Sequence, residues 1–283
     1  MKVRRILTAI DFEKQTERVV AYAAFFAERF GSSLTLLHVI DYLVTPPAYL
    51  DAYIEEERKA AEVKFRTIRN ELSAAGISVD TKVVVGRLQA SFETVVNKTG
   101  ADMLVLGFVS HALRRSSAEK LIKALRMPML VVRGEKSGAV TPGRIAIRRI
   151  LCPVDFSDIS ERALRTAMEL ADTCSSDLEV MHIMPEFTLK KIKDRGHKDK
   201  TVKDYFEMEK DRFSNFLTAS SFSKAGIMER GEPRRRIVAC AREHEIDLIV
   251  MGARGLGLIQ GMIIGSVTDA VLKAAPCPVF VIH

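Results

Sequence analysis

Residues 248–268 have the sequence LIVMGARGLGLIQGMIIGSVT, and this stretch indicates the class of fold. It begins with an uninterrupted apolar run, Leu248 to Met251, which is typical of a strand buried on both faces of a sheet. Five glycines follow, and Ser266 and Thr268 then open an amphipathic helical pattern. We expect a strand, a glycine-rich loop and the start of a helix in that order, which is a building unit of α/β proteins.

The chain contains an internal repeat, so this pattern occurs twice. Residues 3–39 align without a gap onto residues 147–183 at an offset of 144, and Asp11, for example, matches Asp155. Further matches lie 145 positions apart: Gly86 with Gly231, Asp102 with Asp247, and Gly107 with Gly252. A segment rich in glycine, with one proline, separates the copies, and we expect tandem domains at residues 1–140 and 141–283.

Each copy alternates short apolar runs with longer helical patterns, which predicts a parallel sheet with helices on both faces. The first copy has five such runs, at about residues 4–10, 33–39, 79–85, 102–107 and 128–132. We therefore expect two doubly wound, five-stranded α/β domains with the flavodoxin-like strand order. In such sheets a ligand binds beyond the carboxyl ends of the strands, so the loops after the first, second and fourth strands are candidate sites.

The amino-acid composition is typical of globular domains rather than of membrane-spanning or nucleic-acid-binding proteins. The 283 residues are 47% hydrophobic and 28% charged, which suits globular domains, and no apolar run approaches the roughly 18 residues of a membrane span. The N-terminus lacks the apolar core of an export signal, and the four cysteines lack metal or redox spacing, so we expect reduced, packed cysteines in a cytoplasmic protein. The net charge of +7 suits anionic ligands but is too small for a nucleic-acid-binding surface.

The glycine loop of the second copy fits a phosphate group. Glycines let backbone amides approach an anion, and the first amides of the following helix favour negative charge, with hydroxyl donors from Ser266 and Thr268. Glycines that only form turns would give the same pattern, so the glycines alone leave both interpretations open. No lysine follows Gly265 in P-loop spacing, and the first strands run into Asp-Phe without a glycine-rich turn. These absences exclude a P-loop NTPase and a Rossmann dehydrogenase.

One set of motifs distinguishes the second copy: Gly252, Gly255 and Gly265-Ser266 in fixed spacing, Pro153-Val154-Asp155 closing the first strand, and Pro276-Cys277-Pro278 before the last. This set resembles the nucleotide-binding branch of the universal stress protein family, and the resemblance covers nearly the whole chain as two family domains. It implies adenine nucleotide alpha hydrolase-like domains that pair their last strands as an internal pseudo-dimer. It also implies bound ATP or AMP and a homodimer. Separately, Asp269 lies one residue beyond the glycine loop, where its carboxylate is a candidate contact for a Mg²⁺ that accompanies the nucleotide.

The resemblance further implies a role for each residue of the site. Asp155 would hydrogen-bond the adenosine, and the backbone near Ile183 would meet the adenine edge. The ribose and phosphate path would be lined by Gly252, Arg254 and Gly255, and the phosphates would be held by Gly265, Ser266, Val267 and Thr268. The strand ends that carry these groups include Pro153, Val154 and Met251. A carboxylate suits the adenosine end because it accepts from hydroxyl or amino groups and repels an anion.

The first copy departs from this pattern. Eight residues separate Gly107 from Ser116, whereas thirteen separate Gly252 from Ser266, and the shorter loop contains no glycine. Bulky or polar side chains, including that of Phe108, stand where a phosphate cradle needs bare backbone. We therefore expect the first domain to act mainly as a structural partner of the second.

Other polar residues receive structural interpretations. His38 and His182 end the second strands, where a histidine is most often a satisfied core or rim residue. The run from Arg234 to Arg236 begins a helix, where positive charge opposes the dipole, so a phosphate or partner contact is an alternative to a solvated surface.

The sequence supports one leading functional hypothesis and two alternatives. The leading one is a stress-response protein whose second domain binds an adenine nucleotide and acts as a sensor or regulator rather than as an enzyme. The first alternative is a slow ATPase or adenylate-transferring enzyme centred on Ser266 and Asp269, although no carboxylate pair or histidine–carboxylate set converges on the loop. The second is a nucleotide-free scaffold that binds a protein or polyanion through Arg254 and the basic stretch at 190–200.

Overall fold

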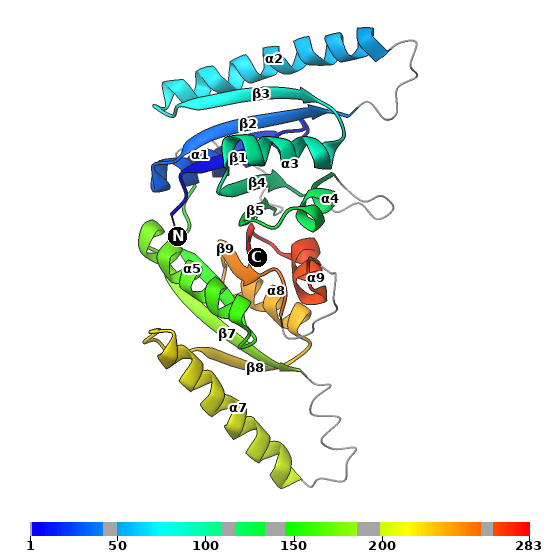
Figure 1. Cartoon of the computed structure of the whole chain (residues 1–283). Helices are drawn as coiled ribbons and strands as arrows, with labels where there is room; N and C mark the ends of the chain where they lie inside the picture. The colour runs from blue at the N-terminus through cyan, green and yellow to red at the C-terminus, as the bar shows by residue number, and fades with distance from the viewer. Residues whose placement is uncertain (1, 42–49, 109–116, 134–144, 186–198, 256–262) are drawn as a thin grey trace. The chain divides into compact units, whose positions relative to one another are not determined.

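A computed structural model of the chain describes residues 2–41, 50–108, 117–133, 145–185, 199–255 and 263–283 (Figure 1). It divides into two compact units, Met1–Ala146 and Ile147–His283. Each unit alternates strands and helices, as the two sequence copies predict.

The first unit contains five strands: β1 (Arg5–Ala9), β2 (Ser33–Ile40), β3 (Val79–Val85), β4 (Met103–Gly107) and β5 (Met129–Val132). Its helices are α1 (Thr16–Phe30), α2 (Leu50–Ala74), α3 (Leu88–Thr99) and α4 (Ser117–Ala124). The strand positions confirm the five apolar runs of the sequence.

The second unit repeats the scheme. Its strands are β6 (Arg149–Val154), β7 (Asp177–Pro185), β8 (Ile227–Gly231), β9 (Leu248–Gly252) and β10 (Val279–Ile282). Its helices are α5 (Asp158–Cys174), α7 (Asp199–Ala219), α8 (Pro233–Glu243) and α9 (Ser266–Ala274).

The strand order within the first unit is β3-β2-β1-β4-β5, and within the second it is β8-β7-β6-β9-β10, with parallel pairing throughout each set. The parallel, doubly wound class is confirmed. The flavodoxin-like order was wrong, because that order puts the third strand beside the first, whereas here it lies outside the second. Alternating helices and strands predict parallel pairing, but each helical connection is long enough to reach either neighbouring position.

The order places the helices on two faces of each sheet. The chain moves outward from β1 to β3 and then returns to β4 on the other side of β1, so right-handed connections put α1 and α2 on one face and α3 and α4 on the other. The packing of α3 against α4, and of α8 against α9, agrees with this arrangement. The central strands are therefore buried on both sides, and Leu248 to Val250 have no exposed surface. The order reverses beside β1 and β6, where the strand ends can frame a ligand.

The duplication extends to individual hydrogen bonds. Oδ2 of Asp102 accepts the backbone N–H groups of Arg4 and Arg5 at 2.8 and 2.9 Å. In the second unit, Oδ2 of Asp247 accepts those of Arg148 and Arg149 at 2.8 and 3.2 Å. The matched aspartates thus hold the start of the first strand of each copy in the same way.

The structure bears on two expectations from the sequence, one about the cysteines and one about membrane-spanning segments. All four cysteines are buried and are free thiols, in agreement with the expectation that they are reduced. Among the helices that the structure describes, none is both long and apolar enough to cross a membrane.

Candidate functional site

Asp155 follows β6 directly and stands where the strand order reverses. Its Oδ1 accepts the hydroxyl of Ser157 at 2.6 Å and the N–H of Ser157 at 3.2 Å. Phe156 between them has φ of +66°, a left-handed conformation that turns the chain sharply from the strand into α5. The Ser157 side chain also accepts the N–H of Ser160 and so caps α5. This local network fixes the carboxylate at the strand end.

Gly255 lies against that carboxylate from the loop after β9. A Cβ atom on Gly255 would lie only 2.0 Å from Oδ2 of Asp155 and 3.0 Å from its Cγ. No side chain fits at that distance, so only glycine allows the two loops to approach this closely. The close approach joins two segments that are 100 residues apart in the sequence.

The start of α9 is tied to the end of β9. The buried Thr268 hydroxyl donates to the carbonyl of Gly252 at 2.8 Å, and the N–H of Gly265 donates to the carbonyl of Ala253 at 2.7 Å. A Cβ on Gly265 would contact Cα of Arg254 at 3.4 Å, so these backbones also run close together. The predicted residues Gly252, Arg254, Gly255, Gly265 and Thr268 are thus brought into one place.

The first turn of α9 offers donors to an anion. Gly265 occupies the N-cap position and supplies no side-chain cap, and the side chain of Ser266 is exposed beside it. The first amides of a helix lack partners within the helix, and the helix dipole makes this end positive. The turn that contains Ser266, Val267 and Thr268 therefore has the chemistry of a phosphate site.

The remaining predicted residues lie in the strands. Pro153, Val154 and Met251 are buried, so their side chains belong to the core and hold the strand ends in place. Ile183 comes directly after His182, and His182 pairs in register with Val154. The side chain of Ile183 is only 6% exposed. Only the backbone of Ile183 is thus a candidate for a ligand contact.

A buried histidine lies beside the site. Nδ1 of His182 is 2.9 Å from the carbonyl of Val154, and the ring of Phe156 stacks on the imidazole at 4.2 Å. Glu209 from α7 brings Oε2 within 3.6 Å of Nε2, and burial lowers the pKa of His182 despite this carboxylate. The geometry supports the structural role predicted for His182. The sequence analysis missed Glu209. The signal that could have found it is helical spacing, since Phe213 and Leu217 follow at four and eight residues and are buried on the same face of α7.

Asp269 was a candidate for metal contact or hydrolysis. Its Oδ2 accepts Nζ of Lys273, one turn further along α9, at 2.7 Å. This ion pair gives the carboxylate of Asp269 a structural role. The other carboxylate beside the loop, that of Asp155, accepts hydrogen bonds from Ser157.

The first unit lacks the equivalent cradle in the part that the structure describes. Asp11 is exposed and binds its own loop, accepting the N–H of Glu13 at 3.0 Å. Phe108 stands where the second unit has Ala253, and its side chain is buried, 4% exposed, with the guanidinium of Arg133 over its ring. The rest of the short loop, with Ser110, Arg115 and Ser116, lies outside the described residues.

The sequence has two basic segments, residues 234–236 and residues 190–200. Arg234 and Arg235 pair with Glu232, and Arg236 pairs with Glu229, so these cations serve local ion pairs and the predicted phosphate contact gains no support. Most of the basic stretch at 190–200 lies outside the described residues.

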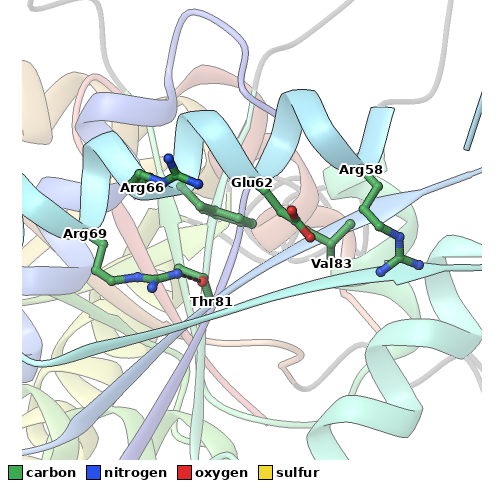
Figure 2. Close-up of a pocket in the computed structure, with 7 residues that line it drawn as sticks. Arg58, Glu62, Arg66, Arg69, Thr81 and Val83 are labelled. Carbon is green, nitrogen blue, oxygen red and sulfur yellow. Dashed lines mark hydrogen bonds between the residues drawn. The ribbon is translucent and has the colours of Figure 1, made fainter. Parts of the chain in front are cut away.

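A groove of about 320 Å³ runs between α2 and β3 of the first unit (Figure 2). Its polar lining consists of Arg58, Glu62, Arg66, Arg69 and Thr81. Arg69 donates to the hydroxyl of Thr81 at 2.6 Å, and Glu62 lies among the arginines and offsets their charge. The groove is at the sheet edge, away from the strand-order reversal beside β1, so it is not the counterpart of the site in the second unit.

Comparisons with known proteins agree on one family. The sequence model of the universal stress protein family matches residues 2–133 and again residues 146–283. A universal stress protein of Mycolicibacterium smegmatis is 25% identical over 297 residues, which cover 98% of this chain and 96% of that one. Universal stress protein YxiE of Bacillus subtilis is 26% identical over 153 residues, 48% of this chain and 98% of YxiE. The crystal structure of a universal stress protein from Archaeoglobus fulgidus has the same fold, with a TM-score of 0.73, 22% identity, and coverage of 99% of this chain and 96% of that one.

Proposed function

The chain belongs to the universal stress protein family, and on that premise we propose that its second domain binds an adenine nucleotide, ATP or AMP. The observation that carries the proposal is the contact of Gly255 with Asp155. It places a fixed carboxylate and a stretch of bare backbone side by side at the strand-order reversal. A hydrogen-bond acceptor lies beside groups that donate hydrogen bonds to an anion. This pair suits a molecule with a nucleoside at one end and a phosphate at the other.

Each end of the nucleotide has a matching group. Asp155 is an acceptor for a ribose hydroxyl, and its charge keeps phosphates away from that end. The first turn of α9, with Ser266, provides amide and hydroxyl donors for the phosphates. The backbone at Ile183 is assigned to the adenine edge. Arg254 is half-buried, and we assign its guanidinium to the phosphate chain as a counter-charge.

We assign any Mg²⁺ to the nucleotide rather than to a protein cage. Mg²⁺ in nucleotide sites is held largely by phosphate oxygens and water. The one nearby carboxylate on α9, Asp269, is bound by Lys273. The same ion pair argues against Asp269 as a hydrolytic base, so the proposed role is binding without efficient turnover.

The proposed biological role is that of a stress-response sensor or regulator. A nucleotide that bridges Asp155 and the start of α9 would add its own charge and hydrogen-bonding groups to this surface of the second domain, and a partner would distinguish the bound form by them. A homodimer in the cytoplasm belongs to the same proposal.

The test compares two matched substitutions. Asp155→Asn keeps an acceptor for Ser157 but removes the charge, whereas Asp11→Asn makes the same change in the first domain. Because a hydrogen bond to a charged group contributes about 1.5–3 kcal/mol against about 1 for a neutral one, we expect Asp155→Asn to weaken ATP or AMP binding about tenfold. Asp11→Asn should leave it unchanged.

Isothermal titration calorimetry with each nucleotide measures both variants, and mass spectrometry of the purified protein identifies any nucleotide that co-purifies. Absence of binding to the unmodified chain would refute the proposal. Equal losses in the two variants would refute the assignment to the second domain.

A further inference from the structure

Three metal-ligating side chains of different types meet on the second unit, apart from the nucleotide loops. Glu179 lies on β7, Cys240 lies on α8, and His244 is the C-cap residue of α8. One ligand atom from each lies within 4.8 Å of the other two, the only such group among the residues that the structure describes. We propose that Glu179, Cys240 and His244 form a binding site for Zn²⁺.

The backbone brings the three side chains together. Cys240 and His244 are four residues apart on α8, so they lie on one face of the helix, one turn apart. That face packs against β7, which carries Glu179. Nδ1 of His244 is 2.5 Å from Oε2 of Glu179, so two of the three ligands already point at one another. Tetrahedral zinc holds neighbouring nitrogen and oxygen ligands about 3.3 Å apart, so this pair of atoms would separate by less than about 1 Å to share the ion.

The burial of the three groups suits an accessible ion. Cys240 is 1% exposed and forms the floor of the site. The side chains of Glu179 and His244 are 28% and 41% exposed and form its mouth. An ion can therefore enter from solvent, and the three protein ligands leave one tetrahedral position for water.

The local charge favours a cation. The site lies at the C-terminal end of α8, the negative end of the helix dipole. The carboxylates of Glu229 and Glu243 lie close enough to Cys240 to add their negative charge to that of Glu179. The nearby cations are already engaged, since Arg236 pairs with Glu229 and Arg149 donates to the carbonyl of His244 at 2.7 Å. A bound divalent cation would take the place of the thiol proton and offset the charge of the carboxylates.

The combination of ligands selects the ion. Sulfur and imidazole ligands disfavour Mg²⁺ and Ca²⁺, which prefer oxygen, and one thiolate with one imidazole and one carboxylate suits Zn²⁺.

The first copy shows that the fold does not need these three residues. Thr35, Val95 and Thr99 occupy the matched positions in β2 and α3. There the Thr99 hydroxyl donates to its own helix, to the carbonyl of Val95 at 2.7 Å. The same packing of helix on strand thus forms without any metal ligand, so packing alone does not explain the group in the second copy.

The zinc site is separate from the proposed nucleotide site. His244 contacts Arg149 at the amino end of β6, whereas Asp155 follows the carboxyl end of that strand. The two sites share no ligand residue, so each can be tested without the other.

The test uses Co²⁺ as a spectroscopic substitute for Zn²⁺ on the reduced full-length chain. We expect one Co²⁺ per chain, with the charge-transfer absorption of a Co²⁺–thiolate bond and the visible bands of a four-coordinate ion, and we expect Zn²⁺ to displace it. Cys240→Ser should abolish the charge-transfer band. Cys174→Ser, which removes another buried thiol of the same unit, should keep it.

His244→Asn supplies a second variant at the exposed mouth of the site, where folding is least affected. It should weaken Zn²⁺ binding at least about tenfold, as should Glu179→Gln. The proposal is overturned if the unmodified chain gives no charge-transfer band, if Cys240→Ser retains the band, or if Zn²⁺ binds the unmodified chain and His244→Asn equally well. Calorimetry with ATP on Cys240→Ser reports on the nucleotide site separately.

Discussion

At the scale of single residues, the proposed nucleotide site of the second domain depends on a glycine, Gly255, because a residue with a Cβ atom could not lie so close to Asp155. Gly255 approaches Asp155 more closely than any side chain would allow, and the carboxylate is held from the other side by Ser157. The aspartate is duplicated in Asp11, but its glycine partner is not. The asymmetry between the two copies therefore begins with one pair of residues rather than with the fold.

A substitution at this glycine tests the contact. In Gly255→Ala the new methyl group would lie 2.0 Å from Oδ2 of Asp155, so one of the two loops must move. We expect nucleotide affinity to fall more than about tenfold and the second unit to lose about 1–3 kcal/mol of stability, as is usual for overpacking. Calorimetry and urea denaturation measure the two effects.

The double variant Asp155→Ala/Gly255→Ala provides the control. It removes the clashing oxygen, so stability should recover while nucleotide binding stays weak. Failure of stability to recover would show that Gly255 matters for a reason other than its contact with Asp155.

At the scale of secondary-structure elements, the strand ends of the second unit are joined through a buried histidine. His182 on β7 reaches the carbonyl of Val154 on β6, stacks on Phe156 and faces Glu209 on α7. The ring thus contacts β6, α7 and the turn after β6, at the edge where the nucleotide is proposed to bind. Its burial makes the charged form costly, which couples this packing to pH.

The pH dependence of stability tests this packing. Burial lowers the pKa of His182 below its ordinary value of 6.5. At a pH between the lowered pKa of the folded chain and 6.5, His182 is protonated in the unfolded chain but neutral in the folded one. The free energy of unfolding therefore keeps its full value above about pH 6.5 and decreases as the pH falls below it. Urea denaturation at about pH 7.5 and 5.5 should show this loss in the unmodified chain, and His182→Gln should reduce it. An equal loss in His182→Gln would assign the effect to other groups.

At the scale of the whole molecule, a duplicated chain has kept two similar units with different loops. The matched aspartates at the strand starts and the matched histidines at the strand ends are preserved in both. Only the second unit has the glycine contacts that leave backbone available to a ligand, and its α8 carries metal ligands that α3 lacks. We infer that the copies have been retained for different tasks.

This division of tasks predicts one nucleotide per chain. Hydrogen exchange with saturating ATP should slow at residues 252–255 and 265–269 and remain unchanged at Asp11 and Gly107. At a ligand concentration of about 100 times Kd, the second unit should gain about 2.7 kcal/mol of stability. A stoichiometry of two, or protection at Asp11, would contradict the asymmetry.

Much of the fold was predictable from sequence because its signals are local. The repeat, the five apolar runs and their parallel pairing follow from periodicity and from helical connections. The strand order did not follow, since a helix after β2 can carry the chain to either side of β1. The candidate site was predictable only as a set of residues on separate loops, because the resemblance supplied their roles and spacing could not place them together.

The sequence by itself determined that this protein has two α/β copies and that one copy has a glycine loop before a helix. These properties depend on residues close together in the chain, whose patterns act through strand and helix periodicity. Only the tertiary structure decided that Gly255 contacts Asp155 and that Glu179 meets Cys240 and His244. Such contacts join residues on different elements, and their distances are determined by how strands and helices pack, which no local pattern encodes.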